Sequence, residues 1–427
     1  MFYVWIGVLA VLGGAWAFLF PLAITADFGK DGDGAALRQM LIYTTGGVLG
    51  VITLGENHRK NSLEKAKNDQ DHIRQVHAER RSRYTTAVEQ LSSDKASIRL
   101  GGVYTLVGLV DEWLADEKTI PSIEERHKEG QVIINNLCAY IRSPLPLAER
   151  AEQLDKDYAK DLQNDFDGDI EKFDADKRAF ARDKAALEEE RQVRQSIIKE
   201  ICERLQYIGT PGSWSKLDYD FSNAHFFYPI GFTNSYFGAS SKFSGATFIE
   251  NADFSRTAFT ERAPFSGATF TQEANFSKAE FAEDADFSGA KFTRSNFSGA
   301  EFTDANFFGV KFTRSNFSGA EFAQDADFSG AEFAQDADFS GAEFTGYTHF
   351  TEAAFQTEPI FGSVPGNEAR FSCKVDPENY DFEVSSESPY KIDIWKPKHN
   401  GFEFTIPKGA ILFDPDEPPE LDDNDDS

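Results

Sequence analysis

The chain has 427 residues, and its 71 acidic side chains outnumber 43 basic ones, which gives a formal net charge of -28 at pH 7. A surface this negative repels the phosphate backbone, so direct nucleic-acid binding is not expected. There are only three cysteines, Cys138, Cys202 and Cys373, which suits a reducing compartment and is too few for a disulfide framework.

Two apolar runs stand at the start of the chain. Phe2–Ala26 contains no charged residue and is long enough to cross a bilayer as a helix, whereas Gln39–Gly55 has only seventeen residues and is rich in glycine. We predict that residues 1–55 form a transmembrane helical hairpin. A cleaved signal peptide is the alternative for the first run, but no basic residue precedes it. Basic residues follow the second run more densely than they occupy the intervening loop, which predicts that the rest of the chain is cytoplasmic.

Helix-forming residues dominate the next part of the chain. We expect a helical stalk over 56–92 and a helical domain over 93–210, in which the charged, alanine-rich stretch 147–190 forms a surface insertion. Ser122 and Glu125 have the spacing of a capping box, which predicts that a helix starts at Ser122. The apolar residues expected to be buried before the insertion are Ile98, Val103, Leu106, Val107, Val110, Trp113, Leu114, Val132, Ile133, Leu137, Tyr140 and Ile141.

A short-period repeat occupies about a third of the chain. Twenty-seven phenylalanines from Phe221 to Phe361 are spaced by five or six residues, and every step of six falls on an even-numbered interval. A five-residue step turns by about 500° on a helix and would scatter the rings around it, so a helix is excluded. One unit of this length cannot bury its own ring, and the units must therefore stack into a solenoid of short β-segments with a continuous core.

Period-two alternation predicts which side chains face this core. A small residue stands two positions before most of these phenylalanines, and the residue between them is polar or charged. The phenylalanine and the small residue are therefore expected to point inward. The small residues on which this prediction depends are Ala246, Ala268, Ala290, Ala300, Ala320 and Ala342.

Units such as the repeated Ala-Asp-Phe-Ser-Gly resemble the pentapeptide repeat family. The resemblance covers residues 219–361 and implies a right-handed quadrilateral β-helix with four units per coil, hence nearly seven coils and a rod about 30 Å long. The six-residue steps depart from the strict family pattern, and we interpret them as one extra residue bulging at the same two corners of each coil.

The segments on either side of the repeat are expected to cover its ends, as open solenoids require. The amphipathic segment 191–207 is placed to cover the first coil, residues 362–413 to cap the last coil, and the acidic segment 414–427 to form a disordered tail. The apolar residues expected to build the second cap are Phe382, Ile392, Ile394, Trp395, Phe402, Phe404 and Ile406.

Four units per coil place every fourth outward residue in one column. The wall that runs through Phe281 and Phe302 then collects acids, and the opposite wall, through Phe292 and Phe312, collects bases. We define the acidic column as Glu280, Glu301, Glu321 and Glu343, and the basic column as Lys291, Arg294, Lys311 and Arg314. Like charges stacked about 5 Å apart repel by about 1 kcal/mol per pair in water. Both columns are candidate partner-binding residues; the alternative is that solvated glutamates only keep the solenoid soluble.

No enzyme chemistry is expected from this sequence. A repeated wall does not bring together a unique nucleophile, base and orienting group. The seven histidines lack a metal-ligand spacing, Ile170 stands where a calcium loop starting at Asp165 requires glycine, and there is no phosphate-binding glycine loop. We therefore predict no catalytic residue, no metal ligand and no cofactor.

These features favour a non-enzymatic scaffold anchored in the inner membrane of a bacterium, with its β-helix presented to a partner on the cytoplasmic face. The partner is either another protein or a second copy of the chain. The alternative comes from the resemblance, because some pentapeptide repeat proteins mimic duplex DNA and engage type II topoisomerases, although sharing a fold does not transfer that role. The basic column interrupts the negative potential that such a mimic needs, whereas residues 315–369 carry acids and no Lys or Arg.

Overall fold

The computed structural model describes residues 33–158, 166, 169–362 and 364–417, together with isolated positions between 5 and 19. It divides into two compact units, Met1–Ser82 and Arg83–Ser427. Helix α2 (Asp33–Leu91) takes in both the second apolar run and the predicted stalk.

The predicted transmembrane hairpin is not found. Within the described residues, no helix is both long and apolar enough to cross a membrane. For Gln39–Gly55 the reason is its length, because the run has only seventeen residues and is bounded by the charged residues Arg38 and Glu56. The first predicted span, Phe2–Ala26, lies largely outside the described residues.

Two helices, α3 (Ala96–Ala115) and α4 (Ile123–Arg142), pack together in the second unit. The side chain of Ser122 caps α4 by accepting a hydrogen bond from the backbone N–H of Glu125, as the sequence predicts. Most of the expected core residues are buried, but Ile98, in the first turn of α3, is 40% exposed, and Val132 is 46% exposed. Val132 lies on the face of α4 opposite its buried stripe, and both Ile98 and Val132 were wrongly assigned to the core.

The charged stretch 147–190 contains η1 (Pro146–Arg150), α5 (Ala151–Leu154) and the first half of α6 (Ile170–Leu205). Helix α6 continues through Glu190 without a break, and its second half is buried by residues such as Val193, Ile197 and Ile201. The stretch and the following amphipathic segment therefore share one helix.

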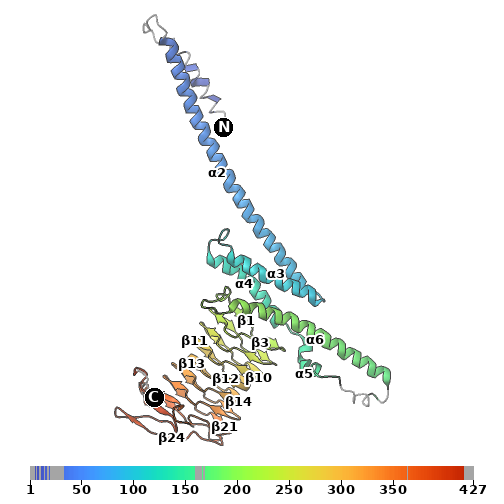
Figure 1. Cartoon of the computed structure of the whole chain (residues 1–427), viewed down its shortest axis with the longest axis vertical. Helices are drawn as coiled ribbons and strands as arrows, with labels where there is room; N and C mark the ends of the chain where they lie inside the picture. Colours follow the sequence, from blue (N-terminus) through green and yellow to red (C-terminus); the bar gives the residue numbers. More distant parts are fainter. Residues whose placement is uncertain are drawn as a thin grey trace, which may run out of the picture. The chain divides into compact units, whose positions relative to one another are not determined.

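The repeat forms a parallel β-solenoid of about six turns over residues 219–355, and its coils follow one another in chain order (Figure 1). Around Phe361 the chain makes only an isolated bridge, so the solenoid is shorter than the nearly seven coils expected. Each coil has four walls, which we number in chain order from the basic column's wall. Wall 1 consists of β2 (His225–Phe226), β6 (Thr247–Phe248), the first half of β10 (Thr269–Asn275), β12 (Lys291–Asn296), β14 (Lys311–Asn316), β17 (Glu332–Phe333) and β21 (Ala354–Phe355).

Wall 3, opposite wall 1, carries the acidic column. It consists of β4 (Tyr236–Phe237), β8 (Ala258–Phe259), the first half of β11 (Glu280–Asp286), β13 (Glu301–Asn306), β15 (Glu321–Phe322) and β19 (Glu343–Phe344). The second halves of these longer strands continue into the two side walls. Shorter strands complete those walls, namely β3 (Ile230–Gly231), β7 (Ala252–Asp253) and β18 (Ala337–Asp338) on wall 2, and β1 (Tyr219–Asp220), β5 (Ser241–Lys242), β9 (Ala263–Pro264), β16 (Ala326–Asp327) and β20 (Thr348–His349) on wall 4.

Phenylalanine fills the interior of the solenoid. All twenty-seven rings of the repeat are at most 4% exposed, which confirms the predicted inward orientation. Along the axis the rings stack in parallel, as Phe297 does on Phe276 and Phe317, with centroids 5.0 Å apart in both pairs. Across the core they meet edge to face, as Phe297 and Phe287 do at 5.4 Å and 80°. Both geometries are favoured by the charge distribution of an aromatic ring.

The corners of a coil are of two kinds. At two corners the sequence Phe-Ser-Gly-Ala forms a type II turn. In the turn at Phe287, the N–H of Ala290 donates to the carbonyl of Phe287 at 2.9 Å and Gly289 has a φ of 65°. At the other two corners the pairing register shifts, for example between Phe270 and Glu273. The shifts coincide with six-residue steps, which supports the predicted bulge of one extra residue.

Both ends of the solenoid are covered. At the first coil α4 contacts β1 and α6 contacts β3. At the other end, β22 (Arg370–Ser372) continues wall 3, with Phe371 stacked on Phe344 at 4.7 Å, and pairs with β28 (Ile411–Phe413), while β23 (Tyr380–Asp381) continues wall 4.

Only part of the predicted second cap is buried. Phe382, Ile392, Phe404 and Ile406 are buried, but Ile394, Trp395 and Phe402 are 47%, 44% and 64% exposed, so these three were wrongly assigned to the cap. They lie in two-stranded antiparallel pairs with too little chain around them to cover both faces. The pairs are β24 (Ile394–Trp395) with β27 (Ile406–Pro407) and β25 (Lys398–His399) with β26 (Phe402–Glu403). Most of the predicted acidic tail, from residue 418 onward, lies outside the described residues.

Candidate protein-interaction site

The acidic column is continuous along wall 3. Parallel pairing places Glu280 beside Glu301, Glu301 beside Glu321, and Glu321 beside Glu343. The first three are exposed and form no ion pair within the described residues, whereas Glu343 pairs with Arg370 of the cap. Three adjacent coils therefore present unpaired carboxylates at the repeat spacing of about 4.8 Å.

Two carboxylates on or beside this column have raised pKa values. Partial burial, followed by the charges of Glu301 and Glu343, raises the pKa of Glu321 above its ordinary value. At the next corner, partial burial and the charge of Asp304 raise the pKa of Asp325 in the same way. The wall therefore holds its negative charge at a cost that a cationic partner would reduce.

The basic column also forms as the register predicts, with Lys291 beside Lys311 and Arg294 beside Arg314. The next coil in chain order places acidic side chains beside Lys311 and Arg314. The ammonium group of Lys311 lies 2.8 Å from Glu332, and the guanidinium of Arg314 lies 3.5 Å from Asp336. The positive charge on wall 1 is thus confined to two coils and is partly compensated.

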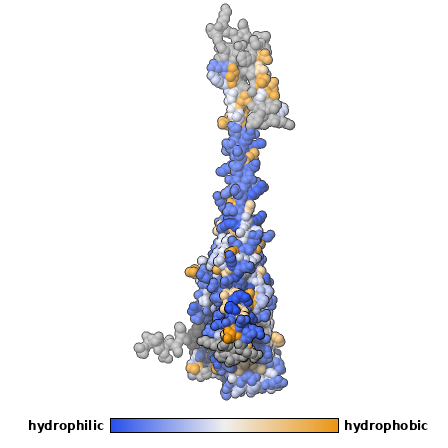
Figure 2. All heavy atoms as spheres, turned by 90° about the vertical axis from the view of Figure 1, so that its right-hand side faces the viewer, coloured by the Kyte–Doolittle hydropathy of each residue, from blue (hydrophilic) through white to orange (hydrophobic). Residues whose placement is uncertain are grey.

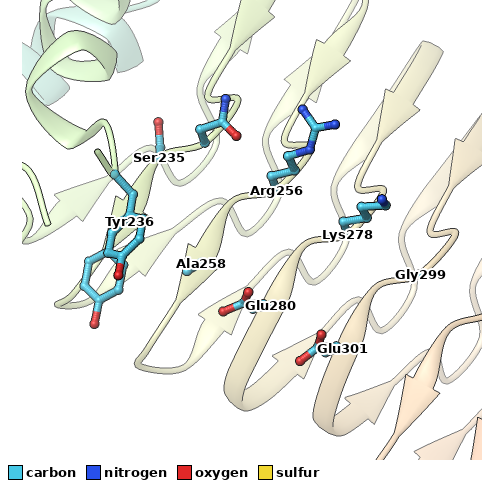
Figure 3. Close-up of a pocket in the computed structure, with 10 residues that line it drawn as sticks. Ser235, Tyr236, Arg256, Ala258, Lys278, Glu280, Gly299 and Glu301 are labelled. Atoms are coloured by element: carbon cyan, nitrogen blue, oxygen red, sulfur yellow. The ribbon is translucent and has the colours of Figure 1, made fainter. Parts of the chain in front are cut away.

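A groove of about 630 Å³ follows the corner beside the acidic column (Figure 3). Arg256 and Lys278 line one side on successive coils, and Glu280 and Glu301 line the other (Figure 3). At one end Tyr236 stacks with Tyr207, with ring centroids 5.8 Å apart and an interplanar angle of 24°. The groove thus combines an aromatic end with two sides of opposite charge.

The two cations of the groove occupy strained backbone positions. Arg256 and Lys278 have φ values of 55° and 56°, and they stand in the left-handed position of the type II turn. Glycine takes this position in the following coils, as at Gly299 with a φ of 63°. A side chain costs about 1 kcal/mol or more there, and such strain is typical of functional positions.

The groove was missed in the sequence, although a signal for it is present. Arg256 and Lys278 stand at this turn position in two successive coils, where the later coils of the same corner have Gly299, Gly319 and Gly341. Tyr207 could not be placed because it follows α6, outside the repeat. As for metals, no cluster of three or more His, Cys, Asp or Glu side chains suited to an ion occurs in the part of the chain that the structure describes.

Comparison with known proteins identifies the repeat. Residues 232–280, 265–311 and 307–354 match the family model described as Pentapeptide repeats (9 copies). No curated protein and no solved structure matches the chain. The Phe-centred units and their four stacked columns agree with this match, and residues 232–354 of the chain are pentapeptide repeats.

Proposed function

We propose that the chain is a non-enzymatic scaffold that holds a basic protein partner on the acidic column of its solenoid. The observation that carries this proposal is the row of exposed, unpaired carboxylates at Glu280, Glu301 and Glu321. A partner that brings Lys or Arg to this row gains Coulomb energy and also relieves the repulsion between neighbouring coils. The packed phenylalanine core keeps the row rigid, so little conformational entropy is lost on binding.

The raised pKa of Glu321 predicts how the affinity for the proposed partner changes with pH. A basic partner stabilises the ionised carboxylate, so binding lowers this pKa and releases a proton when the pH is near it. By linkage, the affinity falls as the pH falls through the raised pKa of the free protein.

Attachment to a membrane is the second part of the proposal. Described residues of the first unit expose apolar side chains, and those of α2 gather in its N-terminal part, while the rest of the helix is hydrophilic (Figure 2). On α2, Val48, Val51 and Leu54 are 60%, 71% and 70% exposed. Large apolar side chains grouped in this way favour a lipid surface. The solenoid then lies on the cytoplasmic side, as the basic residues after this segment predict.

Charge reversal tests the scaffold proposal. In the full-length protein, changing Glu301, Glu321 and Glu343 together to lysine should reduce capture of the partner by about tenfold or more. The melting temperature of the solenoid should fall only slightly, because Glu301 and Glu321 are exposed and only Glu343 loses an ion pair, the one with Arg370. Unchanged capture by a folded variant would refute the assignment.

A second candidate function is mimicry of DNA towards a type II topoisomerase. The observation that favours it is that Glu332 and Asp336 partly neutralise Lys311 and Arg314, which otherwise interrupt the negative potential. A DNA supercoiling assay with added protein tests this candidate. Inhibition or protection of the enzyme that is lost in the triple reversal would support it, and no effect on the enzyme would exclude it.

A further inference from the structure

We propose that the groove beside the acidic column binds an extended peptide segment of a partner protein, with an aromatic residue first, acidic residues next and basic residues last. This inference deepens the proposed function and rests on it. Its starting point is the cavity of about 630 Å³, which is large enough for several residues.

The order of chemistry in the segment follows from the order of groups along the solenoid axis. Tyr236 and Tyr207 stack at one end and offer a flat aromatic surface. Arg256 and Lys278 follow on the next two coils, while Glu280 and Glu301 are displaced one coil further along (Figure 3). A ligand that matches all three therefore carries its negative charges nearer to its aromatic end than its positive charges.

The dimensions suit an extended chain. From the coil of Tyr236 to the coil of Glu301 there are three coil steps, which at about 4.8 Å each make roughly 14 Å. An extended chain advances by about 3.3 Å per residue, so four to five residues span this distance. The groove is lined by exposed charged groups that have no ion-pair partner within the described residues, so a peptide displaces water and no internal salt bridge.

Backbone strain supports a role for the two cations. Glycine would relieve the left-handed turn positions of Arg256 and Lys278, as it does at Gly299 and Gly319 further along the same corner. The chain instead keeps two long cationic side chains on two successive coils of the groove. A binding role gives a physical reason for retaining them.

Two synthetic peptides test the inference by fluorescence anisotropy with the full-length protein. Both are blocked at their ends and labelled with fluorescein, and both contain tryptophan, two aspartates, glycine and two lysines. The matching peptide has the aspartates next to tryptophan, and the permuted peptide has the lysines there. We expect the matching peptide to bind about tenfold more tightly, since two exposed ion pairs on each side distinguish the two orders.

Reversing the groove charges sharpens the test. In the double variant Arg256→Glu and Lys278→Glu, the preference for the matching peptide should disappear. Glutamate is compatible with this turn, because Glu352 adopts a φ of 57° at the equivalent position of another corner. The control variant, Lys242→Glu with Arg262→Glu, makes the same change in net charge outside the groove and should keep the preference.

Equal affinity for the two peptides, binding of neither, or a preference that survives in the folded double variant would overturn the inference. Failure here is distinct from failure of the proposed function. The triple reversal of the acidic column includes Glu321 and Glu343, which lie outside the groove. Loss of partner capture in the double variant Glu321→Lys and Glu343→Lys, together with peptides that do not bind, would support the scaffold and refute the groove.

Discussion

Replacing Phe307 with alanine tests how the core holds the solenoid together. The ring is fully buried and stacks on Phe287 at 5.1 Å and on Phe328 at 4.9 Å. It also meets Phe297 and Phe317 edge to face at 5.5 Å and 5.4 Å. Truncating a buried phenylalanine costs about 3–5 kcal/mol, and loss of these contacts and of those with Phe302 and Phe312 places this position at the upper end, near 4–5 kcal/mol.

The neighbouring residue supplies a matched control. Phe308 lies on the adjoining turn and is 57% exposed, so Phe308→Ala should change stability by about 0.5 kcal/mol or less. A chain with several units need not unfold in one step, and hydrogen exchange measured by mass spectrometry reports the local free energy instead. Protection of β13 and β15 should fall about a thousandfold in Phe307→Ala and stay unchanged in Phe308→Ala. Equal protection in the two variants would refute the description of the core.

Three smaller changes test the surface and the turns. Glu321→Gln should raise the melting temperature by about 1 °C at pH 7, because it removes repulsion from Glu301 and Glu343. Since the folded pKa of Glu321 is raised, this gain should disappear as the pH falls below its ordinary value of 4.5, and an equal gain at both pH values would contradict the assignment. Lys278→Gly should stabilise its turn by about 0.5–1 kcal/mol in hydrogen exchange and weaken the matching peptide; a stabilised variant with unchanged peptide affinity would separate strain from binding. Conversely, Gly267→Ala should destabilise its turn by about 1 kcal/mol although no atom lies within 4 Å of the new methyl group, because its φ is 66°; unchanged stability would show that the turn tolerates side chains.

The solenoid could be predicted in detail because its repeat fixes several levels of structure together. The phase of the six-residue steps specified which phenylalanines stack, and the structure pairs Phe281 with Phe302 and Phe302 with Phe322 as expected. Once the register was known, the acidic and basic columns followed by counting. In a parallel solenoid each residue lies beside its counterpart one coil away, so sequence distance converts directly into spatial distance.

Features that depend on contacts between unlike segments could not be predicted in this way. The ion pair between Glu343 and Arg370 joins the repeat to the cap, where the five-residue count no longer applies. At the aromatic end of the groove, Tyr207, which follows helix α6, stacks on Tyr236 of β4, the first strand of wall 3. The caps have no sequence repeat from which burial could be predicted. Trp395 was therefore predicted to be buried, although it is 44% exposed.

The most direct test of the central claim is quantitative mass spectrometry of proteins captured by the full-length chain. The wild type is compared with the triple reversal of the acidic column and with a control that makes the same charge change on exposed helix positions. The control residues, each changed to lysine, are Glu124, Glu171 and Glu189. The account predicts a partner that is retained by the wild type and the control and is lost from the triple reversal. A partner profile that is the same for all three proteins would contradict it.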